Sequence, residues 1–378
     1  MMLHFGQPAK LKTKKIAFED VYAACDSATL EQLKELSSRR RAIEESINES
    51  SYITEAIARE MSGGLVSRLE QDLHRITQYL PLLENLVLHN EQISNYKTYQ
   101  WDASPKIRWS SALSPSYFFR STKFFQIDHL QFELGMILFL YGAILRERAL
   151  EVLSTDLVQS ATTFREAAGI YHHLALNVLP RLKAAGASEV PPEALTSVST
   201  AMSLICLAEA QAVTTRRAEG NGNSSSLLAK LHHGVTEFLE EASGVLETSV
   251  RDGKDIAPNL TEFIQCCKAL HTLRGQRYHA ESLKASGQIG AAIGVLQSEL
   301  SKIKKKIRGE AKWKSVIEEE ILDASEILQK FVRENDFVWH EKIPSENELP
   351  LPHGNKIVNL IPYSPKRWER HLSFKVMK

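Results

Sequence analysis

The chain has 378 residues, of which 43% are hydrophobic and 24% are charged, the composition of a soluble globular protein. Its 46 Lys and Arg residues balance its 46 Asp and Glu residues, so the overall charge gives no case for a nucleic-acid partner. The longest apolar run, LGMILFLYGAIL at Leu134–Leu145, is roughly half the ~20 residues that a bilayer-spanning helix needs, and it predicts a buried core helix.

Helical periodicity dominates the chain. The aromatic stretch Trp101–Thr122, interrupted by Pro105 and Pro115, reads as an ordered irregular segment between the helices. Helices are predicted at Phe18–Glu49, Ser51–Tyr99, Gln126–Leu153, Thr155–Ala185, Pro192–Glu219, Ser226–Arg251, Asn259–Ser286, Gln288–Arg308 and Lys312–Asn335.

Strand signals occur only near the two ends of the chain. The candidates are Leu11–Phe18, Phe337–Pro344 and Lys356–Pro362. Terminal strands that pair with each other would tie the ends of the chain together. No long linker or composition break divides the sequence, so residues 1–378 are expected to form one domain.

Small residues at apolar helical positions indicate closely packed helices. They cluster at Ala167, Ala168 and Gly169 and again at Ala208, Ala210 and Ala212. One stretch, from Gly275 to Leu296, also resembles a tetratricopeptide unit, which is a helix hairpin stacked on its neighbours. Both features favour a scaffold that binds partners.

No catalytic or metal-binding constellation is found in the sequence. Phosphate-binding, hydrolase-elbow and metalloprotease motifs are absent, and the adjacent pairs His172-His173 and His232-His233 point about 100° apart on a helix. Cys266-Cys267 lies in an apolar helix and reads as buried thiols. We expect a protein that is not an enzyme, with no cofactor, no metal and no small-molecule substrate.

A basic cluster marks the end of the helix predicted at Gln288–Arg308. It reads either as a solvated helix face or as a surface that attracts anionic lipid. Its charged residues are Lys302, Lys304, Lys305, Lys306 and Arg308.

A leucine cluster opens the helix that follows Gly220. Leu227 and Leu231 share one face at a spacing of four residues, and Leu228 lies beside them. Periodicity favours a core role for this stripe. The alternative is an exposed apolar patch that receives an amphipathic partner helix.

Several motifs together resemble the Bro domain family, the ALIX- and BROX-type accessory proteins of the ESCRT membrane-remodelling machinery. They are FREAAGIYHHL at Phe164–Leu174, LAEAQAV at Leu207–Val213, ENDFVWHEKIP at Glu334–Pro344, and the segment Val358–Pro362. The resemblance is clearest over residues 126–362.

This resemblance implies a mainly α fold: a boomerang of helices with a tetratricopeptide-like solenoid core and a small terminal β-sheet. It also implies an adaptor in endosomal sorting that binds the C-terminal amphipathic helix of an ESCRT-III subunit of the charged multivesicular body protein type. Such a protein would be cytoplasmic and recruited to endosomes. A membrane-surface structural protein that acts through its basic face is the alternative.

The resemblance implies that four residues of this chain form the partner site. Leu227 and Leu231, with Leu228 beside them, match the aliphatic positions of the groove. Thr214 stands where ALIX has an aromatic residue. Loss of a ring there removes about 1.5–3 kcal/mol of apolar contact if the ring is fully buried on binding, so altered partner choice is expected.

Overall fold

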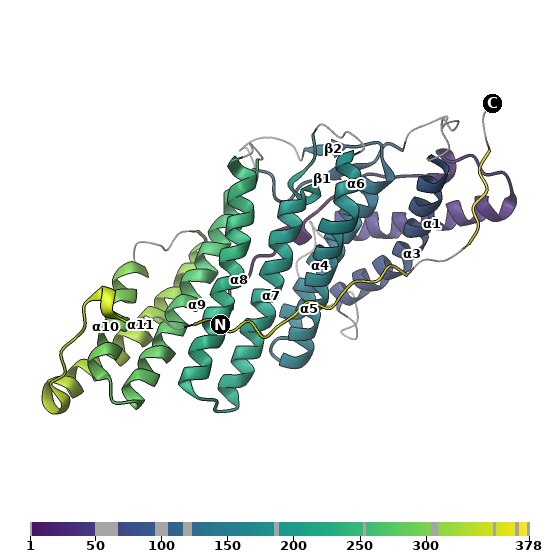
Figure 1. Ribbon diagram of the computed structural model, residues 1–378. Coiled ribbons are helices and arrows are strands. Elements are labelled where there is room, and N and C mark those ends of the chain that lie inside the picture. The colour runs from purple at the N-terminus through teal and green to yellow at the C-terminus, as the bar shows by residue number, and fades with distance from the viewer. Residues whose placement is uncertain are drawn as a thin grey trace.

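The computed structural model describes residues 2–49, 67–94, 105–115, 123–184, 189–251, 255–303, 309–350, 353–366 and 370–375. Within them the protein is mainly helical, and its long helices stand side by side in an elongated row (Figure 1). This confirms the predicted fold class.

Each long helix packs against its neighbour in the sequence, from α1 at one end of the row to α11 at the other. Most predicted helices are found within a few residues of their expected bounds, but the helix predicted from Phe18 begins at Ser27, and a π-helical turn at Leu174–Val178 divides the one predicted at Thr155–Ala185. Residues 51–66, 95–99 and 304–308, also predicted as helical, lie outside the described residues. The helices are α1 (Ser27–Glu49), α3 (Arg68–Ser94), α4 (Leu130–Val152), α5 (Leu157–His173), α6 (Leu179–Ala184), α7 (Thr196–Gly220), α8 (Ser225–Arg251), α9 (Pro258–Ala285), α10 (Ile289–Ile303) and α11 (Ala311–Glu334).

The apolar helix α4 lies in the core, as its composition predicts. Phe132, Ile137 and Phe139 on it are fully buried. A helix that is hydrophobic on all sides is covered on all sides, which is the arrangement seen here. Among the described residues, no helix combines the length and the apolar character needed to cross a bilayer.

The sheet is small, but it is built from residues other than those predicted. Strands β1 (Arg108–Ser110) and β2 (Phe124–Gln126) pair antiparallel, and Thr13 adds an isolated bridge to Trp109. The Leu11–Phe18 candidate therefore contributes one bridge and forms no strand.

The other two strand candidates are also wrong. Phe337–Pro344 begins within a π-helical turn, η5 (Asn335–Trp339), that extends α11. Lys356–Pro362 is part of an extended tail that belongs to no strand. Both segments carry β-branched and aromatic residues, and that composition alone does not supply a neighbouring strand.

Residues 23–25, which precede α1, bond to the C-terminal residues of the described chain. The backbone N–H of Cys25 donates to the carbonyl oxygen of Ser373 at 2.8 Å, and that of Lys375 donates to Ala23 at the same distance. The expected pairing of the terminal strand candidates with each other is not found among the described residues, and the bridge between Ala24 and Phe374 is one that no strand signal indicated.

The tetratricopeptide-like stretch forms the hairpin of α9 and α10, packed against α11. The small residue Gly275 allows α8 to approach α9, because a Cβ there would lie 3.2–3.3 Å from His232 and His233. Ala292, Ile293 and Phe331 share a second apolar cluster at this end of the row.

Candidate functional site

An extended tail, residues 353–366, crosses the row of helices. In Figure 1 it runs as a yellow coil over α8, α7 and α5 towards α3. Backbone bonds fix it at two points: Asn355 N–H donates to the Lys230 carbonyl and Ile361 N–H to the Arg165 carbonyl, each at 3.0 Å. The guanidinium of Arg165 donates in turn to the carbonyl oxygen of Asn359 at 2.7 Å.

Gln211 on α7 connects the tail to both neighbouring helices. Its buried amide Nε2 donates to the carbonyl oxygens of Leu231 and Asn355, each at 2.9 Å. Its Oε1 accepts from the backbone N–H of Ile357 at 3.0 Å. One side chain on α7 therefore bonds three backbone groups, one of α8 and two of the tail.

Two glycines make room for the tail backbone. A Cβ on Gly169 of α5 would lie 1.8 Å from the carbonyl oxygen of Ile361. A Cβ on Gly234 of α8 would lie 2.4 Å from the Asn355 oxygen and 2.1 Å from Gln211 Nε2. No side chain fits at either position without displacing backbone.

Three of the family motifs thus meet in one arrangement. Gly169 comes from FREAAGIYHHL, Gln211 from LAEAQAV, and Ile361 from the tail segment. The sequence contained these residues but gave no reason to single out Gln211, because its three partners become visible only when the helices are assembled.

The four residues of the candidate partner site lie on α7 and the first turns of α8. Thr214 and Leu227 are half-buried, whereas Leu228 and Leu231 are 4% and 2% exposed. Leu228 and Leu231 therefore occupy the core position that periodicity favours. Leu227 and Thr214 remain at the surface.

Local hydrogen bonds hold these surface positions. The Ser224 hydroxyl accepts from the backbone N–H of Leu227 at 3.3 Å, at the start of α8. The hydroxyl of Thr214 donates back to the Ala210 carbonyl at 2.9 Å, which leaves its methyl group as the only apolar contribution at that point of α7.

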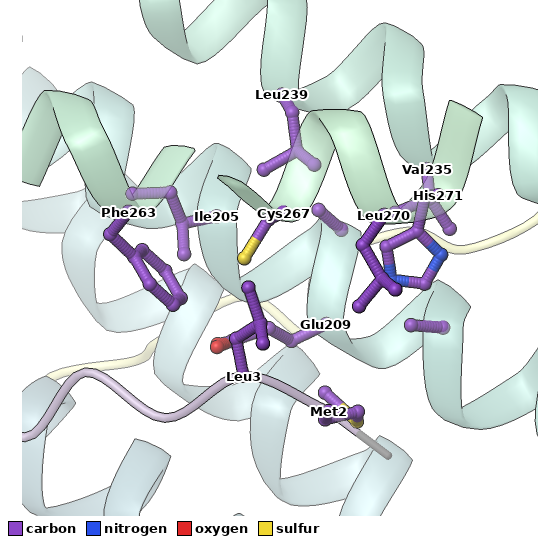
Figure 2. Close-up of a pocket in the computed structure, with 12 residues that line it drawn as sticks. Met2, Leu3, Ile205, Glu209, Val235, Leu239, Phe263, Cys267, Leu270 and His271 are labelled. Atoms are coloured by element: carbon purple, nitrogen blue, oxygen red, sulfur yellow. The ribbon is translucent and has the colours of Figure 1, made fainter. Parts of the chain in front are cut away.

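The N-terminal segment covers the helices through a different set of residues. Figure 2 shows Met2 and Leu3 beside a cavity whose walls include Ile205 of α7, Val235 of α8 and Cys267 of α9. The cavity measures about 20 Å³, room for about one water molecule, so it is no ligand site.

A buried ion pair stands behind this cavity. Arg146 of α4 donates through Nε to Glu209 of α7 at 2.7 Å and through Nη1 to the Phe5 carbonyl at 2.6 Å. Burial raises the pKa of Glu209 and of the Cys206 and Cys267 thiols, and a raised thiol pKa makes a cysteine a poor nucleophile.

Histidines gather between α8 and α9. The Nδ1 atoms of His232 and His271 are 3.1 Å apart, and His232 Nε2 lies 3.1 Å from Glu219 Oε1. Burial lowers the pKa of both rings and lowers that of His233 to about 4. Two ring nitrogens that share one hydrogen bond resist a second proton, so this cluster is uncharged at neutral pH.

The basic cluster is only partly described. Lys302 is paired with Glu346, with Nζ 2.5 Å from Oε1. Lys304, Lys305, Lys306 and Arg308 lie outside the described residues.

The described residues contain no group of three or more His, Cys, Asp or Glu side chains placed to hold a metal ion. A larger cavity of about 360 Å³ lies between α3, α4, α5 and the tail, and its walls include Tyr141, Glu166 and Tyr363. Burial raises the pKa of the Glu166 carboxyl. Neither observation bears on the surface at α7 and α8, where Thr214 and Leu227 stay the candidate partner site.

Comparison with known proteins gives a consistent result. The BRO1-like domain family matches residues 31–375. The chain is 23% identical over 332 residues to "ALG-2 interacting protein X" of Dictyostelium discoideum, covering 82% of this chain and 39% of that protein. It is 28% identical over 213 residues to "BRO1 domain-containing protein BROX" of Homo sapiens, covering 52% of this chain and 50% of that protein. The chain thus spans half or less of the length of these relatives.

Solved structures share the fold. The structure described as "ALIX BRO1 CHMP4C complex" superposes with a TM-score of 0.68 at 17% identity, covering 94% of each chain. One described as "Structure basis for endosomal targeting by the Bro1 domain" gives a TM-score of 0.63 at 16% identity, covering 93% of this chain and 91% of that one.

Proposed function

Because the chain belongs to the BRO1-like domain family, we propose that it is a non-enzymatic adaptor for an ESCRT-III subunit. The ligand is the C-terminal amphipathic helix of a subunit of the charged multivesicular body protein type. The main support is the shared fold with the ALIX BRO1 domain, which has been solved in complex with CHMP4C, along nearly the whole of both chains. Recruitment of the protein to endosomes from the cytoplasm is part of the same proposal.

The docking surface is the pair of half-buried residues Leu227 and Thr214, at the start of α8 and on α7. Leu228 and Leu231 do not contact the partner. They are buried and hold the first two turns of α8 in place beneath the docking surface. A partner helix that packs its apolar face here buries the exposed part of the Leu227 side chain. At Thr214 it contacts only a methyl group. We therefore expect weaker binding than a ring at position 214 would give.

The alternative, a membrane-surface structural protein acting through residues 302–308, rests on the sequence. The one described lysine of that cluster, Lys302, is neutralised by Glu346. No described contact favours this function over the adaptor.

A peptide panel tests the adaptor function. Fluorescently labelled C-terminal helices of the ESCRT-III subunits are titrated with the full chain, and fluorescence anisotropy is recorded. The proposal expects saturable binding of at least one helix and none of a peptide whose apolar positions are scrambled. Equal binding of the native and scrambled helices, or no binding of any helix, would contradict it.

A further inference from the structure

Three consecutive exposed apolar side chains lie at one end of the row of helices, and one of them, Phe337, is the most exposed large apolar residue of the described protein. Phe337 is 83% exposed, Val338 64% and Trp339 50%. All three belong to the π-helical turn η5 that follows α11, at the lower left end of the row in Figure 1. Three consecutive exposed apolar residues are unusual on a folded protein unless they serve a function.

The turn is held in this position by its own polar residues. The buried Asn335 donates through Nδ2 to the Glu341 carbonyl at 3.0 Å and accepts from the Glu341 N–H at 2.9 Å. His340, with a left-handed φ of 52°, donates its N–H to the Asn335 carbonyl at 2.8 Å. The Glu341 carboxylate accepts from the N–H of Gly290 at the start of α10 at 2.8 Å.

These bonds fix the outward direction of the apolar residues. Because the backbone of η5 is tied both to itself and to α10, the three side chains cannot turn into the core without breaking the bonds of the buried Asn335. Exposure is therefore a property of the folded turn.

The charges around the turn are mainly positive. Lys330, Arg333 and Lys342 are exposed and form no ion pair with described residues. The nearby Glu334 is paired with Lys284, whose Nζ lies 2.5 Å from Glu334 Oε2. Asp336 and Glu341 are the two acids of this stretch that form no ion pair with described residues, against the three cations.

We propose that Phe337, Val338 and Trp339 insert into the interfacial layer of a membrane with anionic headgroups. A projecting end that carries a Trp and a Phe suits the boundary between headgroups and acyl chains, where amphipathic rings are favoured. The three cations face the negative surface, each contributing a favourable interaction near anionic lipid. The inference does not depend on the ESCRT-III partner, since it concerns the turn after α11, which packs on α9 and α10, and needs no second protein.

Vesicle flotation of the full chain tests this inference. Phosphatidylcholine vesicles with and without phosphatidylserine are compared for the wild type, for the double variant Phe337→Ser/Val338→Ser, and for Leu322→Ser. Leu322 is 65% exposed on α11, the helix that precedes the turn, so it is a matched control for the loss of an exposed apolar side chain. The wild type and the control are expected to float with the phosphatidylserine vesicles, and the double variant to partition at least tenfold less.

Trp339 supplies a second readout. Brominated lipids quench the fluorescence of an inserted indole, so the wild type is expected to lose emission on binding that Trp339→Phe does not lose. Equal flotation of the double variant, or equal loss in Leu322→Ser, would overturn the inference. So would a wild type that ignores vesicles but self-associates through Phe337 in sedimentation, because the turn would then be an interface between copies.

Discussion

The carbonyl oxygen of Ile361 fills the space beside the Cα of Gly169, where a Cβ would lie only 1.8 Å from it. The tail and α5 are in contact through backbone on both sides, and neither partner has a flexible side chain that could give way. This one contact explains why a glycine interrupts the alanines of α5.

Gly169→Ala is expected to displace the tail and to lower the free energy of unfolding by about 2 kcal/mol, the usual scale of overpacking. Gly244→Ala is the matched control, since a Cβ there meets nothing within 4 Å and the helix gains up to ~1 kcal/mol in propensity. Urea unfolding measures both. Similar stabilities of the two variants would show that the tail adapts to the added methyl group.

Gln211→Glu tests the hydrogen bonds that connect α7, α8 and the tail. The substitution keeps the shape but replaces the Nε2 donor with an oxygen that faces the carbonyls of Leu231 and Asn355. We expect a loss of about 1–3 kcal/mol and faster amide exchange at residues 355–361, because two carbonyl oxygens lose their donor and face an oxygen in its place. Gln265→Glu, at an exposed position on α9, should change neither quantity.

The histidine cluster predicts a stability that falls on acidification. The pKa of His233 is lowered from 6.5 to about 4, and those of His232 and His271 are also lowered. Between pH 6.5 and about 4 the unfolded chain therefore binds more protons than the folded protein, so the free energy of unfolding decreases as the pH drops through this window.

Buried carboxyls with raised pKa values, such as Glu209, act in the opposite direction, because they stabilise the folded protein on acidification. The effect of the histidines is therefore obtained by comparing the pH dependence of stability in the wild type and in histidine variants. Between neutral pH and about pH 5, the free energy of unfolding of the wild type should decrease. In His271→Phe this decrease should be smaller by at least about 1 kcal/mol. His172→Phe, at an exposed position, should follow the wild type. Parallel slopes for all three proteins would refute the role of the cluster.

Thr214→Phe should strengthen binding of the ESCRT-III helix. A buried Phe side chain is worth about 1.5–3 kcal/mol, and 1.4 kcal/mol corresponds to a factor of ten, so a tenfold lower Kd is expected. Thr200→Phe is the control, because Thr200 lies on the same helix and makes the same hydroxyl bond to the carbonyl four residues earlier. If both variants bind like the wild type, position 214 does not face the partner.

The helices could be predicted from the sequence because helical periodicity is a local property. The segment Leu134–Leu145 illustrates this: its apolar residues specify burial whatever the neighbours are. The sheet could not be predicted in the same way. Strands β1 and β2 are three residues long, and they place Trp109 opposite Phe125, sixteen residues away in the chain, a pairing that no local pattern encodes.

The strand predicted at Phe337–Pro344 is wrong for a related reason, since Phe337–Trp339 belongs to a π-helical turn. FVW has high β-propensity, and the bonds that keep it helical come from Asn335 and Glu341 on either side. At the candidate site, spacing correctly favoured the core for Leu231. The role of Gln211 could not be predicted, because two of its three partners, Asn355 and Ile357, belong to the tail and are more than 140 residues away in the chain.

The substitution Leu227→Asp tests the proposed docking surface most directly. Position 227 lies in the first turn of α8, where an acidic side chain interacts favourably with the helix dipole, so the fold should be retained. Leu322→Asp, at an exposed leucine on α11, is the matched control. In anisotropy titrations with the ESCRT-III helix, we expect Leu227→Asp to raise the Kd at least tenfold and Leu322→Asp to leave it unchanged. A Leu227→Asp protein that is folded and binds the helix like the wild type would contradict the account.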